Sequence, residues 1–332
     1  MRRTVAFVKQ SANVFFHILT QCNLKCAHCY INPAQHGTRH LSLETIEAWL
    51  RAFIRRSPGA NLILLGGEPT LHPDLADAVR IARRLRYASV TIDTNGYLFN
   101  DILNRVSPRE VDMFSFSLDG PTPEINDAQR GAGCFATCTA GLNAAKARGF
   151  GISLIYTVSS RNLMHLAKMT PLLADWGVDH LFIQVIGLRG HSAAGRGAGP
   201  SLQVTREEWQ RTVPAVAQAV AAEGIRVTYP KVYLRADDSF ECAGRAADNY
   251  FIFPNGRVYR CPLCEDFPLH ALEIEAGVIA ARPPLNESNL FQLEIAEGCV
   301  MNRLIQPYNL AYHADGTPLY KVACCLLKEQ LI

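Results

Sequence analysis

Short apolar runs rich in β-branched residues recur along the first two thirds of the chain, and longer amphipathic patterns separate them. The short runs predict buried strands and the longer patterns predict helices, because strands and helices bury side chains at different periods. The expected strands cover residues 14–19, 61–65, 89–94, 113–118, 152–158 and 180–186. Strands that alternate with helices in this way predict a parallel sheet.

The expected helices are supported by their polar ends as well as by their apolar stripes. Ser42 precedes an amphipathic stretch that runs to Arg55, with Glu44 near its start, an arrangement typical of a helix N-terminus. Thr205 precedes another such stretch and is a second predicted N-cap. The predicted helices cover residues 42–55, 72–86, 135–148, 163–176 and 205–223, and a further short strand is expected at 225–229.

Polar residues follow the ends of four predicted strands: Cys22, Glu68, Asn95 and Asp119. In a (β/α) barrel the carboxyl ends of all strands converge on one active face. This placement favours an α/β fold with a partial (β/α)6 barrel, although the same alternation is compatible with a doubly wound open sheet.

A chain of 332 residues exceeds the usual single-domain size, and we expect a barrel domain followed by a smaller domain. We place the boundary near residues 230–238, after the short strand expected at 225–229, which gives predicted domains of 1–230 and 231–332, the second of α+β type.

The net charge of +3 is too small to indicate a nucleic acid or a membrane surface as partner. The apolar stretch at 4–19 is interrupted by Lys9, Gln10 and Asn13, and no cleavage site follows it, so it does not resemble a signal peptide. No apolar run reaches the length of a membrane-spanning helix. A cytoplasmic protein is therefore expected.

The chain has 11 cysteines, an odd number that indicates metal binding rather than a disulfide framework. Three lie at 22–29 and six lie from Cys242 onward, which predicts two separate thiolate-rich centres. The remaining two, Cys134 and Cys138, are interpreted as small buried side chains.

Cys22, Cys26 and Cys29 form a C-x3-C-x2-C segment that is closed by Tyr30. Thiolates favour iron–sulfur clusters, zinc or copper(I), and a cluster usually takes one cysteine per iron. Three cysteines on one loop can hold a [4Fe–4S] cluster and leave one iron open for a ligand. A zinc knuckle is the alternative, but its nearest fourth ligand, His28, cannot easily share a tetrahedron with both flanking cysteines.

This segment resembles the cluster loop of the radical S-adenosylmethionine (SAM) superfamily. About forty residues further on, Gly66-Gly67-Glu68-Pro69 is similar to that family's second motif. The resemblance implies a partial barrel in which SAM fills the open iron position and Glu68 meets the SAM ammonium group. The two glycines let the backbone approach a ligand closely.

The resemblance implies further SAM contacts at the strand ends. Ser117 and Asp119 resemble positions that bind the ribose or the polar tail of SAM, and Arg130 resembles a basic residue that meets its carboxylate. Tyr30 resembles the aromatic that packs near the adenine. The other candidates are Thr94 and Asn95, for which a turn or capping role is the alternative.

The spacing from Cys242 through Gly256 to Cys261 is similar to the opening half of the SPASM motif, which carries an auxiliary [4Fe–4S] cluster. The later part of that motif is not present, and the six cysteines are too few for two clusters. We expect one auxiliary cluster in a shortened, Twitch-like domain, with zinc as the alternative. The expected ligands are Cys242, Cys261, Cys264 and Cys324, with Cys299 and Cys325 as alternates.

The resemblance implies an enzyme that cleaves SAM reductively and abstracts a substrate hydrogen, with reduced flavodoxin or ferredoxin as electron donor. The expected role is maturation of a ribosomally made peptide or natural-product biosynthesis, and a small-metabolite oxidoreductase is the alternative. About twenty residues precede the cluster loop, too few for a fused leader-peptide domain, so a peptide would need separate recognition. A non-catalytic iron–sulfur or zinc protein is the alternative from another class.

Overall fold

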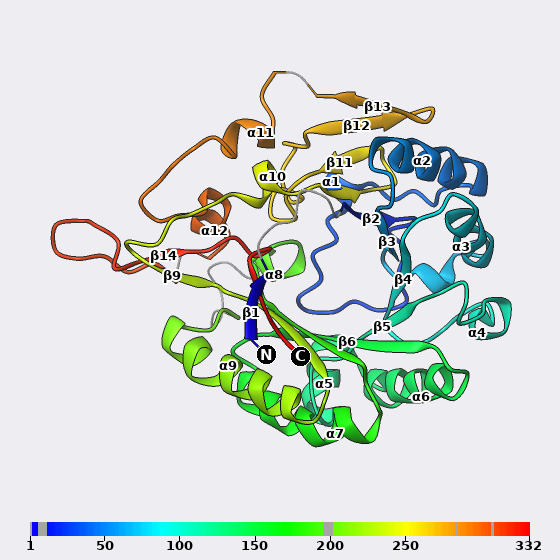
Figure 1. Cartoon of the computed structure of the whole chain (residues 1–332), viewed down its shortest axis with the longest axis horizontal. Helices are drawn as coiled ribbons and strands as arrows, with labels where there is room; N and C mark the ends of the chain where they lie inside the picture. Colours follow the sequence, from blue (N-terminus) through cyan, green and yellow to red (C-terminus); the bar gives the residue numbers. More distant parts are fainter. Residues whose placement is uncertain (1, 6–11, 195–201, 283, 307–308) are drawn as a thin grey trace.

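The computed structural model describes residues 2–5, 12–194, 202–282, 284–306 and 309–332. Within these residues a single curved sheet of thirteen strands dominates the molecule (Figure 1). Its centre is a run of parallel neighbours: β2 (Asn13–His17), β3 (Asn61–Leu65), β4 (Ser89–Thr94), β5 (Met113–Ser117), β6 (Gly151–Val158), β7 (His180–Val185) and β8 (Arg226–Pro230). The predicted parallel α/β architecture is confirmed.

The helices lie along the outside of this curved sheet (Figure 1). They include α2 (Leu43–Arg56), α3 (Leu75–Arg84), α4 (Ile102–Arg105), α6 (Cys134–Ala147), α7 (Met169–Asp175) and α9 (Arg206–Ala222), while α5 (Pro123–Arg130) lies between β5 and α6 in the chain. A doubly wound sheet would have helices on both faces. The structure therefore has the predicted partial barrel, with its helices outside, and not the doubly wound open sheet.

The caps predicted at two helices are present. Ser42 accepts a hydrogen bond from the Thr45 amide at the start of α2. Thr205 and Glu208 form a reciprocal capping box at the start of α9. Each cap satisfies backbone donors that a helix N-terminus leaves free.

Two predicted helices begin later than expected. A 3-10 turn, η1 (Pro69–Leu71), precedes the stretch at 72–86, and α3 begins only at Leu75, because Pro73 disfavours a helical conformation at His72. The stretch at 163–176 opens with a 3-10 segment, η2 (Leu163–Lys168), before α7. Pro171 lies in the first turn of α7, where its missing amide costs no helical hydrogen bond.

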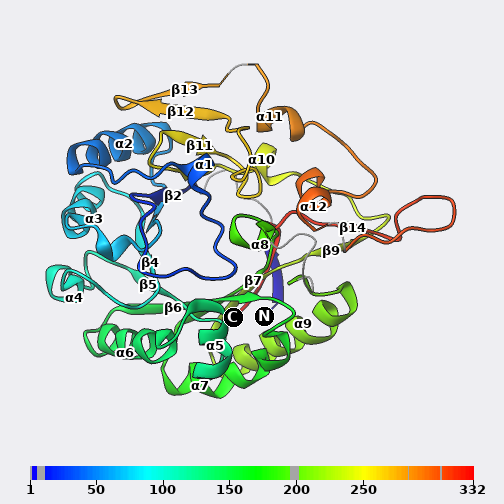
Figure 2. The ribbon, with the colours of Figure 1, turned by 180° about the vertical axis from the view of Figure 1, so that it is seen from behind.

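The C-terminal part of the chain adds strands to both edges of the barrel sheet. At one edge β10 (Asn249–Ile252) pairs in parallel with β2, and β11 (Arg257–Tyr259), β12 (Leu272–Glu275) and β13 (Val278–Ala281) follow as antiparallel neighbours. At the other edge β15 (Lys328–Leu331) pairs with β8, and β1 (Arg2–Val5) pairs with β15, so the two ends of the chain lie together (Figure 2). The two predicted domains therefore share one continuous sheet, and the boundary near residue 230 stays a prediction.

Smaller elements complete the C-terminal part. β9 (Tyr233–Arg235) and β14 (Tyr320–Val322) form a separate two-stranded sheet. The short helices are α10 (Ala243–Ala246), α11 (Glu287–Leu290) and α12 (Val300–Ile305), together with α1 (Pro33–His36) and α8 (His191–Ala194) near the barrel mouth. A second apolar cluster gathers here, apart from the main barrel core, and it includes Phe253, Tyr259 and several cysteines.

Candidate active site

The loop that carries Cys22, Cys26 and Cys29 leaves β2 and runs through the open middle of the barrel (Figure 1). Its backbone is anchored from two sides. The Ala27 amide donates to the Gln129 carbonyl at 2.8 Å, and the His191 amide donates to the Cys29 carbonyl at 2.8 Å. These bonds fix the loop over the carboxyl ends of the strands, where barrels place their active sites.

The three cysteines border a central cavity of ≈ 330 Å³. Burial raises the pKa of Cys22 to about 11 and the pKa of Cys26 to about 12. Burial also raises the pKa of Cys29. Thiols in such a site become thiolates when a metal binds, because the metal displaces the proton. Three partly buried thiols on one anchored loop, open to a cavity, fit a cluster that leaves one iron free for a ligand.

The glycine pair after β3 supports this loop by close backbone contact. A Cβ atom on Gly66 would collide with the Leu19 carbonyl oxygen, and one on Gly67 would collide with the Gln21 carbonyl oxygen. The Gly67 amide donates to the Leu19 carbonyl at 3.1 Å, and the Glu68 amide donates to the Gln21 carbonyl at 2.9 Å. The two glycines also border the cavity, so they serve both the loop and the space in front of it.

The Glu68 carboxylate is buried and holds the ends of β3 and β4 together. Its Oε1 accepts from the Thr70 amide at 3.0 Å, the Thr70 hydroxyl at 2.6 Å and the Thr94 hydroxyl at 2.8 Å. Its Oε2 accepts from the Asn95 amide at 2.7 Å. Burial raises its pKa and these hydrogen bonds lower it, with burial dominant. The side chain is not among those that border the cavity, so its contact with SAM stays a prediction.

Asp119 has a similar position behind the cluster loop. Its Oδ2 lies 2.6 Å from Nε of Arg130 and 3.2 Å from Nε2 of His28, and its Oδ1 accepts from the Thr157 amide at 2.7 Å. Burial alone would raise its pKa, but the charges of Arg130 and His28 hold the pKa well below its usual range. His28 lies on the cluster loop itself, and this contact therefore ties the loop to the ends of β5 and α5.

The other predicted SAM contacts border the cavity: Tyr30, Thr94, Asn95, Ser117 and Arg130. The Tyr30 hydroxyl lies 2.7 Å from Nε2 of His17, and the Arg189 guanidinium lies 5.1 Å from the centre of the Tyr30 ring. Asn95 donates from Nδ2 to Oδ1 of Asn23 on the cluster loop at 2.8 Å. The structure therefore brings these five residues around the central cavity. The role of each residue in binding SAM stays a prediction.

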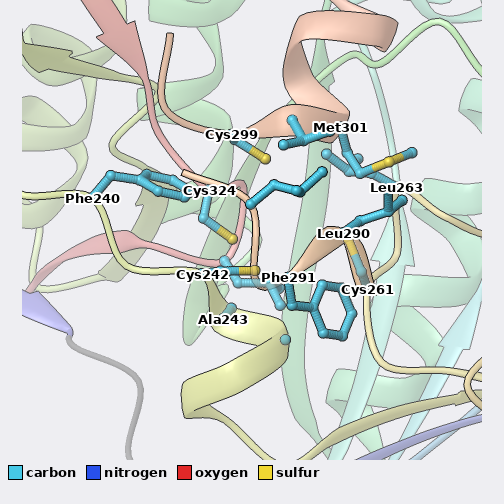
Figure 3. Close-up of a pocket in the computed structure, with 14 residues that line it drawn as sticks. Phe240, Cys242, Ala243, Cys261, Leu263, Leu290, Phe291, Cys299, Met301 and Cys324 are labelled. Carbon is cyan, nitrogen blue, oxygen red and sulfur yellow. The ribbon is translucent and has the colours of Figure 1, made fainter. Parts of the chain in front are cut away.

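A second, smaller cavity lies in the C-terminal part of the chain and is bordered by four cysteines (Figure 3). These are Cys242, Cys261, Cys299 and Cys324, from four separate segments of the sequence. Phe240, Leu290 and Phe291 supply apolar walls, and none of the described residues that border this cavity is a carboxylate or a histidine. A set of four thiols in apolar surroundings fits an iron–sulfur cluster.

A cluster and a zinc ion place different demands on these four thiols. Among the residues that the structure describes, no three histidine, cysteine or carboxylate side chains lie close enough together to ligate one metal ion. Zinc needs its four ligands on one ion. A cluster takes one cysteine for each iron and therefore accepts cysteines spread around a cavity.

Cys264 is buried but is directed elsewhere. It does not border the four-cysteine cavity; its thiol interacts with Cys261 and with the Glu287 carboxylate. Glu287 also accepts from the amides of Arg260, at 2.6 Å, and of Cys261, at 3.0 Å. The structure therefore places the alternate Cys299, rather than Cys264, among the four cysteines.

The adjacent cysteines Cys324 and Cys325 border different cavities. Cys324 borders the four-cysteine cavity, whereas Cys325 borders the central cavity. Their side chains interact with each other, so together they form part of the wall between the two cavities.

Sequence reasoning missed several residues that shape the site. The sequence indicates His28 only as an alternative zinc ligand and gives no indication of a role for Gln129 or His191. The signal for α5, which carries Gln129 and Arg130, was the Thr122-Pro123 pair, since proline is common at the first position of a helix. Nothing in the sequence marked His191 as a neighbour of the cluster loop.

Comparison with protein-family profiles identifies a family for the part of the chain that carries the cluster loop. Residues 17–170 match the profile of the Radical SAM superfamily. The matched part of the chain is therefore similar to the radical SAM superfamily, a family whose cofactors are a [4Fe–4S] cluster and SAM.

Two curated proteins are similar to this chain over more than half of its length. The chain is 29% identical over 274 residues to the mycofactocin maturase MftC of Mycobacterium ulcerans, covering 78% of this chain and 69% of that protein. It is 29% identical over 218 residues to the pre-heme d1 synthase of Dinoroseobacter shibae, covering 64% of this chain and 52% of that protein.

Solved structures agree on the fold. SuiB of Streptococcus suis bound to S-adenosylmethionine superposes with a TM-score of 0.65 at 13% identity, covering 89% of this chain and 74% of that one. Native anSMEcpe with bound AdoMet gives a TM-score of 0.58 at 15% identity, covering 78% and 75%. In the part of the chain that the structure describes, no helix has the length and apolar character to cross a membrane.

Proposed function

We propose that this protein is a radical SAM enzyme that modifies a ribosomally made peptide. The observation that carries the proposal is the anchored three-cysteine loop, which the Gly66-Gly67 turn supports over a cavity of ≈ 330 Å³. The choice of a peptide is supported by the similarity to a mycofactocin maturase and by the fold shared with SuiB, a protein also solved bound to its precursor peptide SuiA.

The residues of the chain take distinct roles in this proposal. Cys22, Cys26 and Cys29 hold the cluster, and the strand-end residues around the cavity orient SAM. Bound there, the cluster and SAM supply a 5′-deoxyadenosyl radical that removes a hydrogen atom from the substrate. Glu68 positions Thr94 and Asn95 through its hydrogen bonds, in addition to the contact that we propose with the SAM ammonium group.

We further propose that Cys242, Cys261, Cys299 and Cys324 ligate one auxiliary [4Fe–4S] cluster in a SPASM- or Twitch-like region. The shared four-cysteine cavity supports this set. A cluster beside the central cavity suits a net oxidation, since it is placed to accept an electron from the substrate. A reduced flavodoxin or ferredoxin in the cytoplasm is the proposed electron donor.

A small-metabolite oxidoreductase is the second candidate function. The similarity to a pre-heme d1 synthase over 64% of the chain favours it. Both candidates use the same cofactor site, so they differ only in what occupies the rest of the central cavity.

The test is anaerobic reconstitution with iron and sulfide, followed by incubation with SAM and dithionite. We expect 5′-deoxyadenosine from the wild type and none from the variant in which Cys22, Cys26 and Cys29 are all alanine. No 5′-deoxyadenosine from an iron-loaded wild type would favour the non-catalytic iron–sulfur protein. A mass change in a precursor peptide encoded beside this gene would decide for the peptide over the metabolite.

A further inference from the structure

The charged side chains that border the central cavity are almost all neutralised by neighbours. Arg130 lies 2.6 Å from Asp119, and Nη1 of Arg189 lies 3.0 Å from Oε2 of Glu265. These pairs leave little net charge for a ligand to meet on their side of the cavity. Lys328 and Asp93 are exceptions, because both border this cavity and neither forms an ion pair with another described residue.

Lys328 is the first residue of β15, paired in register with Pro230 at the end of β8, and it borders the central cavity. Within the described ranges of the chain, no carboxylate forms an ion pair with its ammonium group and no hydrogen bond involves it. Burial lowers the pKa of Lys328, and the charges of the neighbouring Cys325 and Cys324 thiols raise it. Lys328 is partly buried and has no carboxylate partner among the described residues, so this position is suited to a ligand that supplies a negative charge.

Cys325 borders the same cavity three residues before Lys328. The charge of this thiol, when ionised, acts on Lys328, so the two side chains are near neighbours. The pair lies on the C-terminal segment, whereas the three-cysteine loop leaves β2. The cavity therefore has a cofactor side and a separate cationic side.

We propose that Lys328 binds a carboxylate of the substrate in the central cavity. For the peptide substrate proposed above, on which this inference rests, the group is an acidic side chain or the C-terminal carboxylate. The pairing places the substrate between Lys328 and the cluster loop and gives the enzyme a preference for acidic substrates. The carboxylate of SAM is the other source of the same chemistry.

The test uses Cys325 as a reporter and needs no substrate. Anaerobic holoenzyme is treated with iodoacetate, an anion, or with iodoacetamide, its neutral analogue, and labelling of Cys325 is followed by peptide mass spectrometry. The ratio of the two rates cancels any difference in thiol reactivity. We expect this ratio to fall roughly tenfold in Lys328→Gln, the scale of one hydrogen bond to a charged group, and to be retained in Lys328→Arg.

A second measurement uses only the wild-type protein, so its result does not depend on whether a variant folds. Acetate should slow the labelling of wild-type Cys325 by iodoacetamide, whereas acetamide at the same concentration should not. An unchanged ratio in Lys328→Gln, no protection by acetate, or a Cys325 that neither reagent reaches would each overturn the proposal.

Repeating the acetate experiment with SAM present distinguishes a substrate carboxylate from the carboxylate of SAM as the group that Lys328 binds. If Lys328 binds the substrate, saturating SAM leaves the acetate effect in place and Lys328→Gln binds SAM with wild-type affinity. If SAM abolishes the effect and the variant binds SAM weakly, the carboxylate belongs to SAM and the substrate assignment is wrong. Formation of 5′-deoxyadenosine is scored separately, so a failure of the proposed function is distinguishable from a failure of this inference.

Discussion

The carboxylate of Asp119 lies 2.6 Å from Nε of Arg130, and both side chains are buried behind the cluster loop. The pair connects the end of β5 to the end of α5, and His28 joins it from the loop. A buried ion pair is not itself evidence of stability, but removing one partner leaves an uncompensated charge.

We therefore predict that Asp119→Asn destabilises the protein by about 3–5 kcal/mol. The asparagine keeps the size of the side chain but leaves the Arg130 charge without its partner. Anaerobic urea unfolding measures the change, and loss of iron to a chelator should be faster in the same variant.

The matched control is the exposed pair formed by Arg51 and Glu47 on α2, whose nitrogen and oxygen lie 2.6 Å apart. Solvent screens this pair, so Arg51→Ala should cost only about 0.5 kcal/mol or less. Equal losses from the two variants would mean that burial does not strengthen the Asp119–Arg130 interaction.

The second prediction concerns the fit between the glycine turn and the cluster loop. Gly67→Ala places a Cβ atom against the Gln21 carbonyl oxygen, so the loop must shift. We expect the loss of about four irons per chain after reconstitution, the content of one cluster. In Gly187→Ala the added Cβ makes only ordinary contacts, the nearest at 3.8 Å to Arg189, and iron content should be normal. Full iron loading of Gly67→Ala would show that the loop tolerates the shift.

The third prediction is a pH dependence of stability from His180, which is buried at the start of β7 and lies 2.8 Å from the Thr228 hydroxyl. Burial, followed by the charges of Arg226 and Lys328, lowers the pKa of His180 from 6.5 to about 3. Between these values the unfolded chain binds the proton and the folded chain does not. Stability should therefore fall as pH decreases from 6.5 towards 3, by about 1.4 kcal/mol per pH unit for this group.

In His180→Gln the unfolded chain no longer binds a proton at this position. The free energy of unfolding should therefore decrease less steeply with decreasing pH than it does in the wild type. His313→Gln, at an exposed position, is the control and should follow the wild-type curve. Urea unfolding at pH 7, 6 and 5 measures all three proteins. Parallel curves for the wild type and His180→Gln would contradict the prediction.

The sequence predicted the barrel strands well, because strands buried on both faces appear as short apolar runs. The runs at 61–65 and 89–94 coincide with β3 and β4. The attachment of the C-terminal strands could not be predicted. β10 pairs with β2 across more than two hundred residues, and β15 pairs with β8 at the opposite edge. Such pairings depend on the packing of the whole molecule and leave no local pattern.

The candidate site was predicted in its residue types but not in its orientations. The motif resemblance indicated Glu68 and Asp119 as SAM ligands, yet their carboxylates are engaged by backbone and side-chain groups behind the cavity wall. Spacing cannot show which way a carboxylate points. Likewise the sequence predicted Cys264 as a ligand, and the structure shows its thiol in contact with Cys261 and Glu287 but not among the side chains that border the four-cysteine cavity, so its role as a ligand stays a prediction.

The last prediction uses this difference to test the auxiliary cluster. Cys299→Ala removes one of the four thiols around the cavity, so an auxiliary cluster should be lost or incomplete, with iron falling towards about four per chain. Cys264→Ala, a buried cysteine in the same region, should retain about eight irons, because its thiol lies outside the cavity. Iron analysis and the spectrum of the reduced protein are compared in both variants, with circular dichroism as the folding control. If Cys264→Ala loses the iron and Cys299→Ala keeps it, the C-x2-C pair ligates the cluster and the ligand set proposed here is wrong.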